Sequence, residues 1–368
     1  MKKLLILSCS TGEGHNSAAK ALAEAAERAG IYSHIADPVA FGGKKAESLV
    51  ASCYNNMIKR SPALFGAVYQ AGRAYSATGV TSPVYLANKL YSRALSDYIK
   101  GEGYTAVICT HLYGMESVTA AYRKGLLDVP AYGVLTDYTC IPFIAETGLT
   151  GYFSPHPDLT AELTRKGIAE NLVFPLGIPV SGRFNVPQSR SQAREELGVP
   201  QNGKMYLVMS GGVGCGNLSA LCDELLACGG GEFSVYIIAG RNEKLRRELS
   251  ESYESRKNVR ILGFTDKVAL YMRAADVLIS KAGGLSSTEA AVAGVPFVQL
   301  MTIPGCETKN TEFFSKRGMS VKATSPGQAA AAAARLAGSP DEARRMVEMQ
   351  RKNIPQNAAD KIIEQVMK

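Results

Sequence analysis

The sequence predicts two doubly wound α/β domains in one chain, and three observations lead to this prediction. The chain has 368 residues, which is more than a single domain usually holds. Apolar, strand-like runs alternate with helical patterns, and this alternation occurs twice. The runs are continuously apolar rather than alternating with polar residues, as in parallel sheets that are covered on both faces.

A stretch between the two groups of apolar runs predicts the boundary between the two domains. Residues 177–187 are rich in glycine and proline and show no helical period, which is typical of a linker. We expect an N-terminal domain over residues 1–176, a linker over 177–190 and a C-terminal domain over 191–368, with a last helix that can pack back on the N-terminal domain. The expected strands are Lys3–Ser8, Tyr32–Ala36, Ala106–Thr110, Ala131–Thr136 and Leu172–Phe174 in the first half, and Met205–Met209, Ser234–Ala239, Val259–Leu262, Val277–Ser280 and Pro296–Leu300 in the second.

The first residues, MKKLLILSCSTGEGHNSAAKAL, allow two interpretations. Two lysines, an apolar run and then Ser8 and Cys9 resemble a secretion signal that ends in a lipid-modified cysteine. The apolar core from Leu4 to Leu7 is short, however, against the roughly 7–15 residues of a secretion signal. We therefore prefer a first strand, a glycine-bearing loop and a helix that begins near Ser17.

The composition excludes several other classes of protein. Hydrophobic residues make up 46% of the chain and charged residues 20%, as in an ordinary globular protein. No stretch approaches the roughly 20 apolar residues that span a bilayer. The eight cysteines form no CxxC pair and show no metal-ligand spacing, so we expect neither a zinc site nor a disulfide framework.

The net charge of +8 is concentrated in residues 41–100, where eight basic side chains accompany two acidic ones and many aromatic rings. Such a segment suits an anionic bilayer surface, where cations meet the headgroups and rings lie at the interface. A solvated helical face with tyrosines in the core is the alternative, and no motif supports nucleic-acid binding. The candidate membrane and acceptor residues are Lys59, Arg60, Phe65, Tyr69 and Arg73.

In each half of the chain, one glycine-rich loop follows the first expected strand. In parallel sheets ligands bind at the carboxyl ends of the strands, so we expect the site in a cleft between the domains. The loop over residues 10–17 carries Gly14 and His15, and its glycine spacing approximates a dinucleotide fingerprint that lacks the third glycine. The loop over 210–217 includes Gly212 and predicts a phosphate cradle, but no Gly-Lys-Ser/Thr follows, so it is not a P-loop.

Two further loops of the second half offer polar groups to a ligand. In the stretch 280–291, Lys281, Gly283 and Gly284 precede a helix of small residues. Amides near Gly284 to Ser287, a stretch that includes Ser286, are suited to a diphosphate. Glu289 lies about one turn into that helix, where a carboxylate can accept two hydroxyl hydrogen bonds from a ribose. In the stretch 303–310, Glu307 and Asn310 stand one helical turn apart and can bond a polyhydroxylated ligand.

Together these motifs resemble the MurG-like glycosyltransferases, in the branch of monogalactosyldiacylglycerol synthases and processive diacylglycerol glucosyltransferases. Order and spacing agree along nearly the whole chain. The matching stretches are GEGHNSAA at 12–19, TDY at 136–138, GIPV at 177–180, KAGGLSSTE at 281–289 and IPGCETKN at 303–310.

The resemblance implies the GT-B architecture, with two Rossmann-like domains facing a central cleft. It places the acceptor in the N-terminal domain and a UDP-sugar in the C-terminal one. The resemblance implies that Glu289 holds the donor ribose and that amides around Gly212 and 283–287 face the diphosphate. It also implies that the backbone near Phe264 contacts uracil. Glu307 and Asn310 would touch the sugar or its neighbouring loop. Segment 41–100 matches the family's acceptor and membrane-docking region, which implies a cytoplasmic protein at the inner face of the cell membrane.

The chain departs from the family pattern at two places. Cys306 stands where family members usually carry a glutamine, and this leaves the donor sugar open. After the TDY stretch, lipid-glycosylating relatives usually show a histidine and a tryptophan, whereas this chain has TCIPFI at 139–144. The acceptor is therefore left open as well.

Inverting transfer needs a base for the acceptor hydroxyl and a stabiliser for the departing diphosphate. Asp137, at the end of an expected strand, is the first candidate base, with helix capping or turn formation as its structural alternative. His15 is the second candidate, either as a base or to orient the acceptor. No Asp-x-Asp occurs, so we expect no metal and no cofactor beyond the UDP-sugar.

The expected function is transfer of a hexose from a UDP-sugar to a membrane lipid such as diacylglycerol, with inversion to a β-linkage. Three alternatives remain open. They are a MurG-like N-acetylglucosaminyltransferase acting on a lipid-linked cell-wall precursor, a UDP-sugar 2-epimerase, and a non-catalytic sensor of nucleotide sugars.

Overall fold

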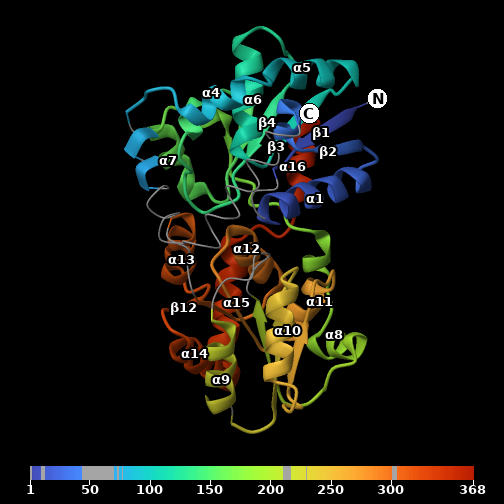
Figure 1. Cartoon of the computed structure of the whole chain (residues 1–368), viewed down its shortest axis with the longest axis vertical. Coiled ribbons are helices and arrows are strands. Elements are labelled where there is room, and N and C mark those ends of the chain that lie inside the picture. Colours follow the sequence, from blue (N-terminus) through green and yellow to red (C-terminus); the bar gives the residue numbers. More distant parts are fainter. Residues whose placement is uncertain are drawn as a thin grey trace. The chain divides into compact units, whose positions relative to one another are not determined.

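The computed structural model describes residues 2–9, 13–43, 70–72, 74–76, 78–209, 217–228, 230–300 and 305–368. The chain forms two compact units, shown in Figure 1 with the sequence running from blue to red. Unit 1 comprises Met1–Gly182, Pro304–Cys306 and Asn357–Lys368, and unit 2 comprises Arg183–Ile303 and Glu307–Gln356.

Unit 1 is built on a six-stranded parallel sheet with the order β2-β1-β3-β4-β5-β6. Its strands are almost entirely buried except for the edge strand β2, whose Tyr32 is 55% exposed. A strand covered by helices on both faces needs apolar side chains in both directions, which explains the unbroken apolar runs. The strands are β1 (Lys3–Leu7), β2 (Tyr32–Ala36), β3 (Ala106–Cys109), β4 (Ala131–Val134), β5 (Gly151–Phe153) and β6 (Val173–Phe174).

Helices cover both faces of this sheet. Leu4 and Ile6 of β1 pack against α1 (Glu13–Arg28) and α16 (Ala358–Val366) on one face, whereas Leu5 and Leu7 pack against α5 (Ser92–Gly101) and α6 (Leu112–Arg123) on the other. The last helix, α16, therefore lies beside the first helix, α1 (Figure 1). The remaining helices of the unit are η1 (Pro38–Gly42), α4 (Pro83–Lys89), η2 (Ile144–Glu146), η3 (Pro157–Leu159), α7 (Thr160–Arg165) and η4 (Glu170–Leu172).

Unit 2 repeats the plan with a second six-stranded parallel sheet, in the order β12-β11-β10-β7-β8-β9. Ala329, Ala330, Ala332 and Ala333 of α14 (Pro326–Gly338) are buried in a core that also contains residues of α9 (Leu218–Cys228) and of strands β7 and β8. The strands are β7 (Lys204–Met209), β8 (Phe233–Ile238), β9 (Val259–Leu262), β10 (Val277–Ser280), β11 (Phe297–Leu300) and β12 (Val321–Ala323). The helices are η5 (Gly182–Asn185), α8 (Arg190–Leu197), α9 (Leu218–Cys228), α10 (Glu243–Ser252), α11 (Val268–Ala274), α12 (Gly284–Ala293), α13 (Cys306–Lys316), α14 (Pro326–Gly338) and α15 (Pro340–Asn353).

The prediction of two doubly wound parallel-sheet domains is confirmed, and each expected strand lies within two residues of an observed one. The sequence analysis missed β5 and β12, which have three residues each. One expectation at the N-terminus is wrong, because α1 begins at Glu13 rather than near Ser17. His15 and Gly14 therefore lie in the first turn of a helix and not in a loop.

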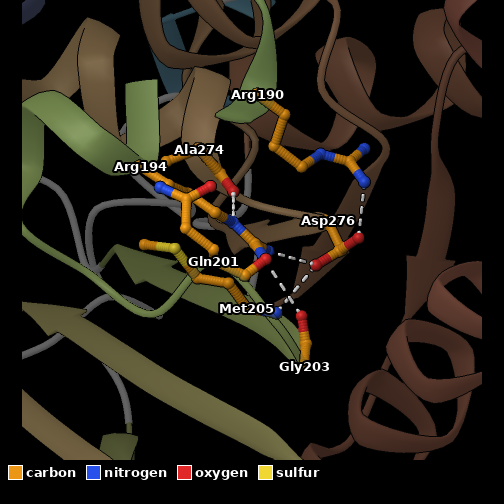
Figure 2. A network of polar contacts seen from close by, with 7 residues as sticks. All are labelled: Arg190, Arg194, Gln201, Gly203, Met205, Ala274 and Asp276. Carbon is orange, nitrogen blue, oxygen red and sulfur yellow. Dashed lines mark hydrogen bonds and ion pairs between the residues drawn. The ribbon is translucent and has the colours of Figure 1, made fainter. Parts of the chain in front are cut away.

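A buried charged network fixes α8 to the sheet of unit 2 (Figure 2). Asp276, just before β10, accepts hydrogen bonds from Nη2 of Arg194 at 2.8 Å, Nη1 of Arg190 at 2.6 Å and the amide of Met205 at 2.8 Å. The Arg194 guanidinium also donates to the carbonyls of Ala274, Gln201 and Gly203. Arg194 is 4% exposed, so these partners offset the cost of burying its charge.

Candidate active site

The carboxyl ends of β1, β3 and β4 lie level at one edge of the sheet in unit 1. The register pairs Leu7 with Cys109, and Cys109 with Gly133. After β1 the chain continues to β2 on one side and later returns to β3 on the other, so the strand order reverses between β1 and β3. Such a switch point is where open parallel sheets bind ligands.

His15 lies at this edge, in the first turn of α1, and two other segments contact its ring. Its Nδ1 is 2.7 Å from the carbonyl oxygen of Thr110, directly after β3, and 3.2 Å from Oγ1 of Thr136, after β4. Asn16 and Ser8 share a 2.7 Å side-chain hydrogen bond that ties the first turn of α1 to the end of β1. Three neighbouring strand ends thus position one imidazole.

These contacts determine which nitrogen of His15 carries the proton. A carbonyl oxygen can only accept, so Nδ1 donates to Thr110 and the neutral ring keeps the lone pair on Nε2. Burial lowers the pKa of His15 below its ordinary value of 6.5. The ring is therefore neutral at physiological pH, and its Nε2 is suited to accept a proton.

Asp137, the first candidate base, is partly exposed and lies in the bend after β4, next to Thr136. Because Thr136 contacts His15, the structure brings both candidate bases to the same edge of the sheet. Asp37, which the dinucleotide interpretation would assign to a ribose, instead caps η1 by accepting the amide of Val39 at 2.9 Å.

A second switch point lies in unit 2, between β7 and β10. The register places Met209 of β7 beside Ser280 of β10, and Ser280 beside Gln299 of β11. The residues after Met209, which include Gly212, lie outside the described residues. After Ser280 the chain passes through Lys281 and Ala282 into α12.

The N-terminus of α12 fits an anionic ligand. Its N-cap residue, Gly283, has no side chain to cap the first amides, and the first intrahelical bond is the 2.9 Å one from the Ser287 amide to the Gly283 carbonyl. The amides of Gly284, Leu285 and Ser286 therefore have no acceptor within the helix. Together with the helix dipole they form a ready site for a phosphate oxygen.

Glu289 projects from the second turn of the same helix and is partly buried. It makes no hydrogen bond or ion pair within the part of the chain that the structure describes. Burial alone raises the pKa of this carboxyl to about 7. A desolvated carboxyl that has no partner among the described residues can accept hydrogen bonds from a ligand.

Lys281, Glu307 and Asn310 form the surroundings of Gly283. Nζ of Lys281 is 2.5 Å from Oε1 of Glu307, and a Cβ added at Gly283 would stand 4.0 Å from both atoms. Asn310 is fully buried and donates to the carbonyl of Ala282 at 3.0 Å. Glu307 and Asn310 lie in α13 rather than in a loop, and these contacts fix the loop that leads into α12.

The structure also describes two other predicted donor residues, Ser287 and Phe264. The prediction that Ser287 offers its amide to a diphosphate is wrong, because that amide bonds to Gly283 and the hydroxyl is buried against Gln299. Phe264 is 64% exposed after β9, with the guanidinium of Arg241 4.6 Å from its ring centre. The expected contact between the backbone near Phe264 and uracil stays a prediction.

Much of the basic segment lies beyond what the structure describes, including Lys59, Arg60, Phe65, Tyr69 and Arg73. In the described part, Tyr85 and Tyr91 belong to the core and not to an interface. Leu86 and Leu90 lie one turn apart, the first in α4 and the second at its end, and they are 52% and 85% exposed. No described helix has the length and apolar character needed to cross a bilayer.

Thr110, Thr136 and His111 were not predicted from the sequence as site residues. The first two contact His15 from 95 and 121 residues away, and no local pattern reports such a contact. The signal that was available is positional, since each residue follows the end of a parallel strand. Within the described residues, no group of three or more His, Cys, Asp or Glu side chains could hold a metal ion.

Comparison with known proteins gives a different match for each half of the chain. Residues 15–180 match the monogalactosyldiacylglycerol (MGDG) synthase family, and residues 206–318 match the glycosyltransferase family 28 C-terminal domain. The chain is 23% identical over 378 residues to the processive diacylglycerol beta-glucosyltransferase of Bacillus subtilis, with 100% of this chain and 95% of that protein covered.

Solved structures share the fold over the full length. MurG from Acinetobacter baumannii superposes with a TM-score of 0.61 at 16% identity, covering 100% of this chain and 99% of that one. The UDP-GlcNAc 2-epimerase of Neisseria meningitidis, bound to UDP-GlcNAc, gives 0.62 at 15% identity with the same coverage. The architecture is therefore GT-B.

Proposed function

We propose that this chain, a UDP-sugar-dependent hexosyltransferase of the MurG-like GT-B group, transfers a hexose from a UDP-sugar to diacylglycerol with inversion to a β-linkage. The Bacillus subtilis relative named above supports the lipid acceptor, since this diacylglycerol glucosyltransferase matches along the whole chain, and residues 15–180 match the MGDG synthase family. The observation that carries the proposal is Glu289, a partly buried carboxyl without a partner in the described residues, on the helix whose first amides are uncapped.

Unit 2 holds the donor in this proposal. The amides of Gly284 and Ser286 bind the diphosphate, and Lys281, held by its ion pair with Glu307, lies next to Gly283. Glu289 accepts hydrogen bonds from the two ribose hydroxyls. As the sugar leaves, negative charge grows on the diphosphate, and these fixed groups stabilise it without the need for a metal ion.

Unit 1 supplies the base. His15 is neutral and has Nε2 unprotonated, so it takes the proton from the acceptor hydroxyl as that oxygen attacks the anomeric carbon of the sugar. Asp137, one residue from Thr136, stabilises the imidazolium that forms. This assignment reverses the order given to the two candidates from the sequence, because the fixed tautomer favours His15.

The lipid acceptor requires contact with a membrane, and the exposed leucines near the end of α4 suit this contact. Leu86 and Leu90 lie close to Lys89, so apolar and positively charged side chains are adjacent. Replacing both leucines by glutamine is expected to weaken binding to anionic liposomes at least tenfold, because burying a leucine contributes about 1.5–3 kcal/mol. Cosedimentation measures this, and equal binding by the variant would exclude this surface.

The decisive experiment gives the purified protein liposomes containing diacylglycerol together with radiolabelled UDP-glucose, UDP-galactose or UDP-N-acetylglucosamine. We expect one of these hexoses to appear in a β-linked glycolipid. The same donors without an acceptor test for the 2-epimerase, and a lipid-linked cell-wall precursor tests for the MurG-like activity. If no donor yields a lipid product, the proposal fails.

The role of Glu289 has a quantitative test. Replacing Glu289 by alanine is expected to weaken UDP binding about a hundredfold, since two hydrogen bonds to a charged group contribute about 1.5 kcal/mol each. Calorimetry with UDP and with 2′,3′-dideoxy-UDP measures this, and the dideoxy ligand should bind both proteins equally. Glu312→Ala is the matched control, because it removes a partly exposed glutamate side chain from α13.

The raised pKa of Glu289 predicts the direction of the pH dependence. The ionised carboxylate is the better acceptor, and the carboxyl ionises as pH rises through about 7. UDP affinity should therefore increase from pH 6 to pH 8 in the wild type. In Glu289→Gln it should stay flat, and an equal rise in both proteins would assign the effect to another group.

A further inference from the structure

Two histidine rings meet at the carboxyl edge of the sheet in unit 1. His111 follows Thr110 directly, and the centres of its ring and that of His15 are 4.6 Å apart with an interplanar angle of 89°. The ring of Tyr113 contacts His111 as well, at 4.4 Å. His111 is also the N-cap of α6, since its Nδ1 accepts the amide of Tyr113 at 3.2 Å.

These contacts give the two rings opposite tautomers. The Nδ1 of His111 accepts a hydrogen bond and so carries no proton, which places the proton of the neutral ring on Nε2. The Nδ1 of His15 donates to the Thr110 carbonyl, so its proton lies on Nδ1. The carbonyl of Thr110 therefore holds His15 through its Nδ1 proton. The next residue, His111, holds the same ring through an edge-to-face contact.

We propose that His111 is a positioning residue for His15, fixing the orientation of its ring so that Nε2 alone is left to take the acceptor proton. The inference rests on the proposed role of His15 as the base. His111 is anchored independently of any substrate, through its cap on α6. The orientation of His15 is thus built into the fold before the acceptor binds.

The electrostatics of the pair agree with this role. Burial lowers the pKa of both rings, and the positive charge of a protonated His15 lowers that of His111 further. The pair therefore takes up one proton, and it goes to His15. Among the described residues, Tyr113 on α6 is in ring contact with His111, Asp137 is adjacent in sequence to Thr136, and Glu13 begins the helix that carries His15.

A purely structural role for His111 would be that of a helix cap, and asparagine tests this directly. Asparagine is a strong N-cap whose side-chain oxygen can accept the Tyr113 amide. His111→Asn therefore keeps the cap and removes the ring. The chain offers a matched control in His156, whose Nδ1 accepts the amide of Asp158 at 3.2 Å at the start of η3. His156→Asn makes the same change at a different helix.

NMR of the imidazole nitrogens reads the tautomers without any need for activity. The chain has four histidines, so single substitutions suffice to assign them. We expect His15 to carry its proton on Nδ1 and His111 on Nε2. In His111→Asn the titration midpoint of His15 should rise toward 6.5, whereas in His156→Asn it should stay at the wild-type value. A His15 proton on Nε2, or an unchanged midpoint in His111→Asn, would overturn the proposal.

Kinetics with the UDP-hexose and diacylglycerol then test the consequence for catalysis. We expect kcat of His111→Asn to fall about ten- to a hundredfold with the KM for the UDP-sugar unchanged, because a displaced base loses its alignment. In this variant, the fall of kcat on the acidic side of its pH profile should move to higher pH. Wild-type kcat in His111→Asn would refute a positioning role. If the asparagine variant fails to fold, the same measurements on His111→Ser, together with the tautomers of the wild type, decide whether His111 positions His15.

The two proposals fail in different ways. If the wild type transfers no hexose, the proposed function falls, yet the tautomers and the His15 titration still report whether His111 positions the ring. If the wild type is active and His111→Asn matches it in kcat and pH profile, only the positioning role is wrong.

Discussion

His15→Asn is expected to lower kcat by about 10²- to 10⁴-fold while UDP binding stays unchanged, since removing a general base costs that much. Asparagine places an amide N–H near the position of Nδ1, so the hydrogen bond to the Thr110 carbonyl can persist. The lone pair of Nε2 has no counterpart in the variant. Single-turnover kinetics with diacylglycerol liposomes measure the chemical step, and UDP calorimetry provides the control.

Asp137→Asn separates the two candidate bases. If His15 is the base, this change removes a charge that stabilises the imidazolium and lowers kcat less than His15→Asn does. The acid limb of the wild-type profile should lie below pH 6.5, because burial lowers the pKa of His15 and the ring must be neutral to act. Near-normal kcat in His15→Asn, together with a large loss in Asp137→Asn, would make Asp137 the base.

Most of the fold could be predicted because buried parallel strands have a strong sequence signal. Strand β1, with four fully buried apolar residues in succession, is an example. The missed strands, β5 and β12, have three residues each, too few to show any period. The start of α1 was misplaced because residues 12–14, rich in glycine, are typical of a loop, whereas Gly14 is accommodated in the first helical turn.

The candidate site could be predicted in its location but only partly in its contacts. A glycine pair after β10 correctly indicated an uncapped helix N-terminus at Gly283. The same pattern could not tell which polar groups are already engaged within the protein, so Ser287 was assigned to a diphosphate although its amide bonds to Gly283 and its hydroxyl to Gln299. Asn310, expected at the sugar or its neighbouring loop, contacts that loop through the carbonyl of Ala282. Their roles depend on partners from other elements, and spacing along the chain carries no information about those partners.

The buried network around Asp276 was also absent from the sequence analysis, although its removal should have the largest effect on stability. Arg194 is 4% exposed, and Asp276→Ala leaves its buried guanidinium without an anionic partner. Breaking a buried ion pair in this way lowers the free energy of unfolding by about 3–5 kcal/mol. Hydrogen exchange of the β7 and β10 amides in unit 2 should accelerate by about 10²- to 10⁴-fold. Arg190→Ala, at a side chain that is 50% exposed, should cost at most about 1 kcal/mol.

A double variant shows whether the ion pair or the backbone contacts matter more. Replacing Arg194 by methionine and Asp276 by leucine removes both charges, and for a simple buried pair this is often neutral. Here it also leaves three carbonyl groups and the amide of Met205 without their partners. Each unpaired buried group costs about 1–3 kcal/mol, so we expect the double variant to be as unstable as Asp276→Ala. Wild-type stability in the double variant would mean that neither the ion pair nor these backbone hydrogen bonds add net stability to unit 2.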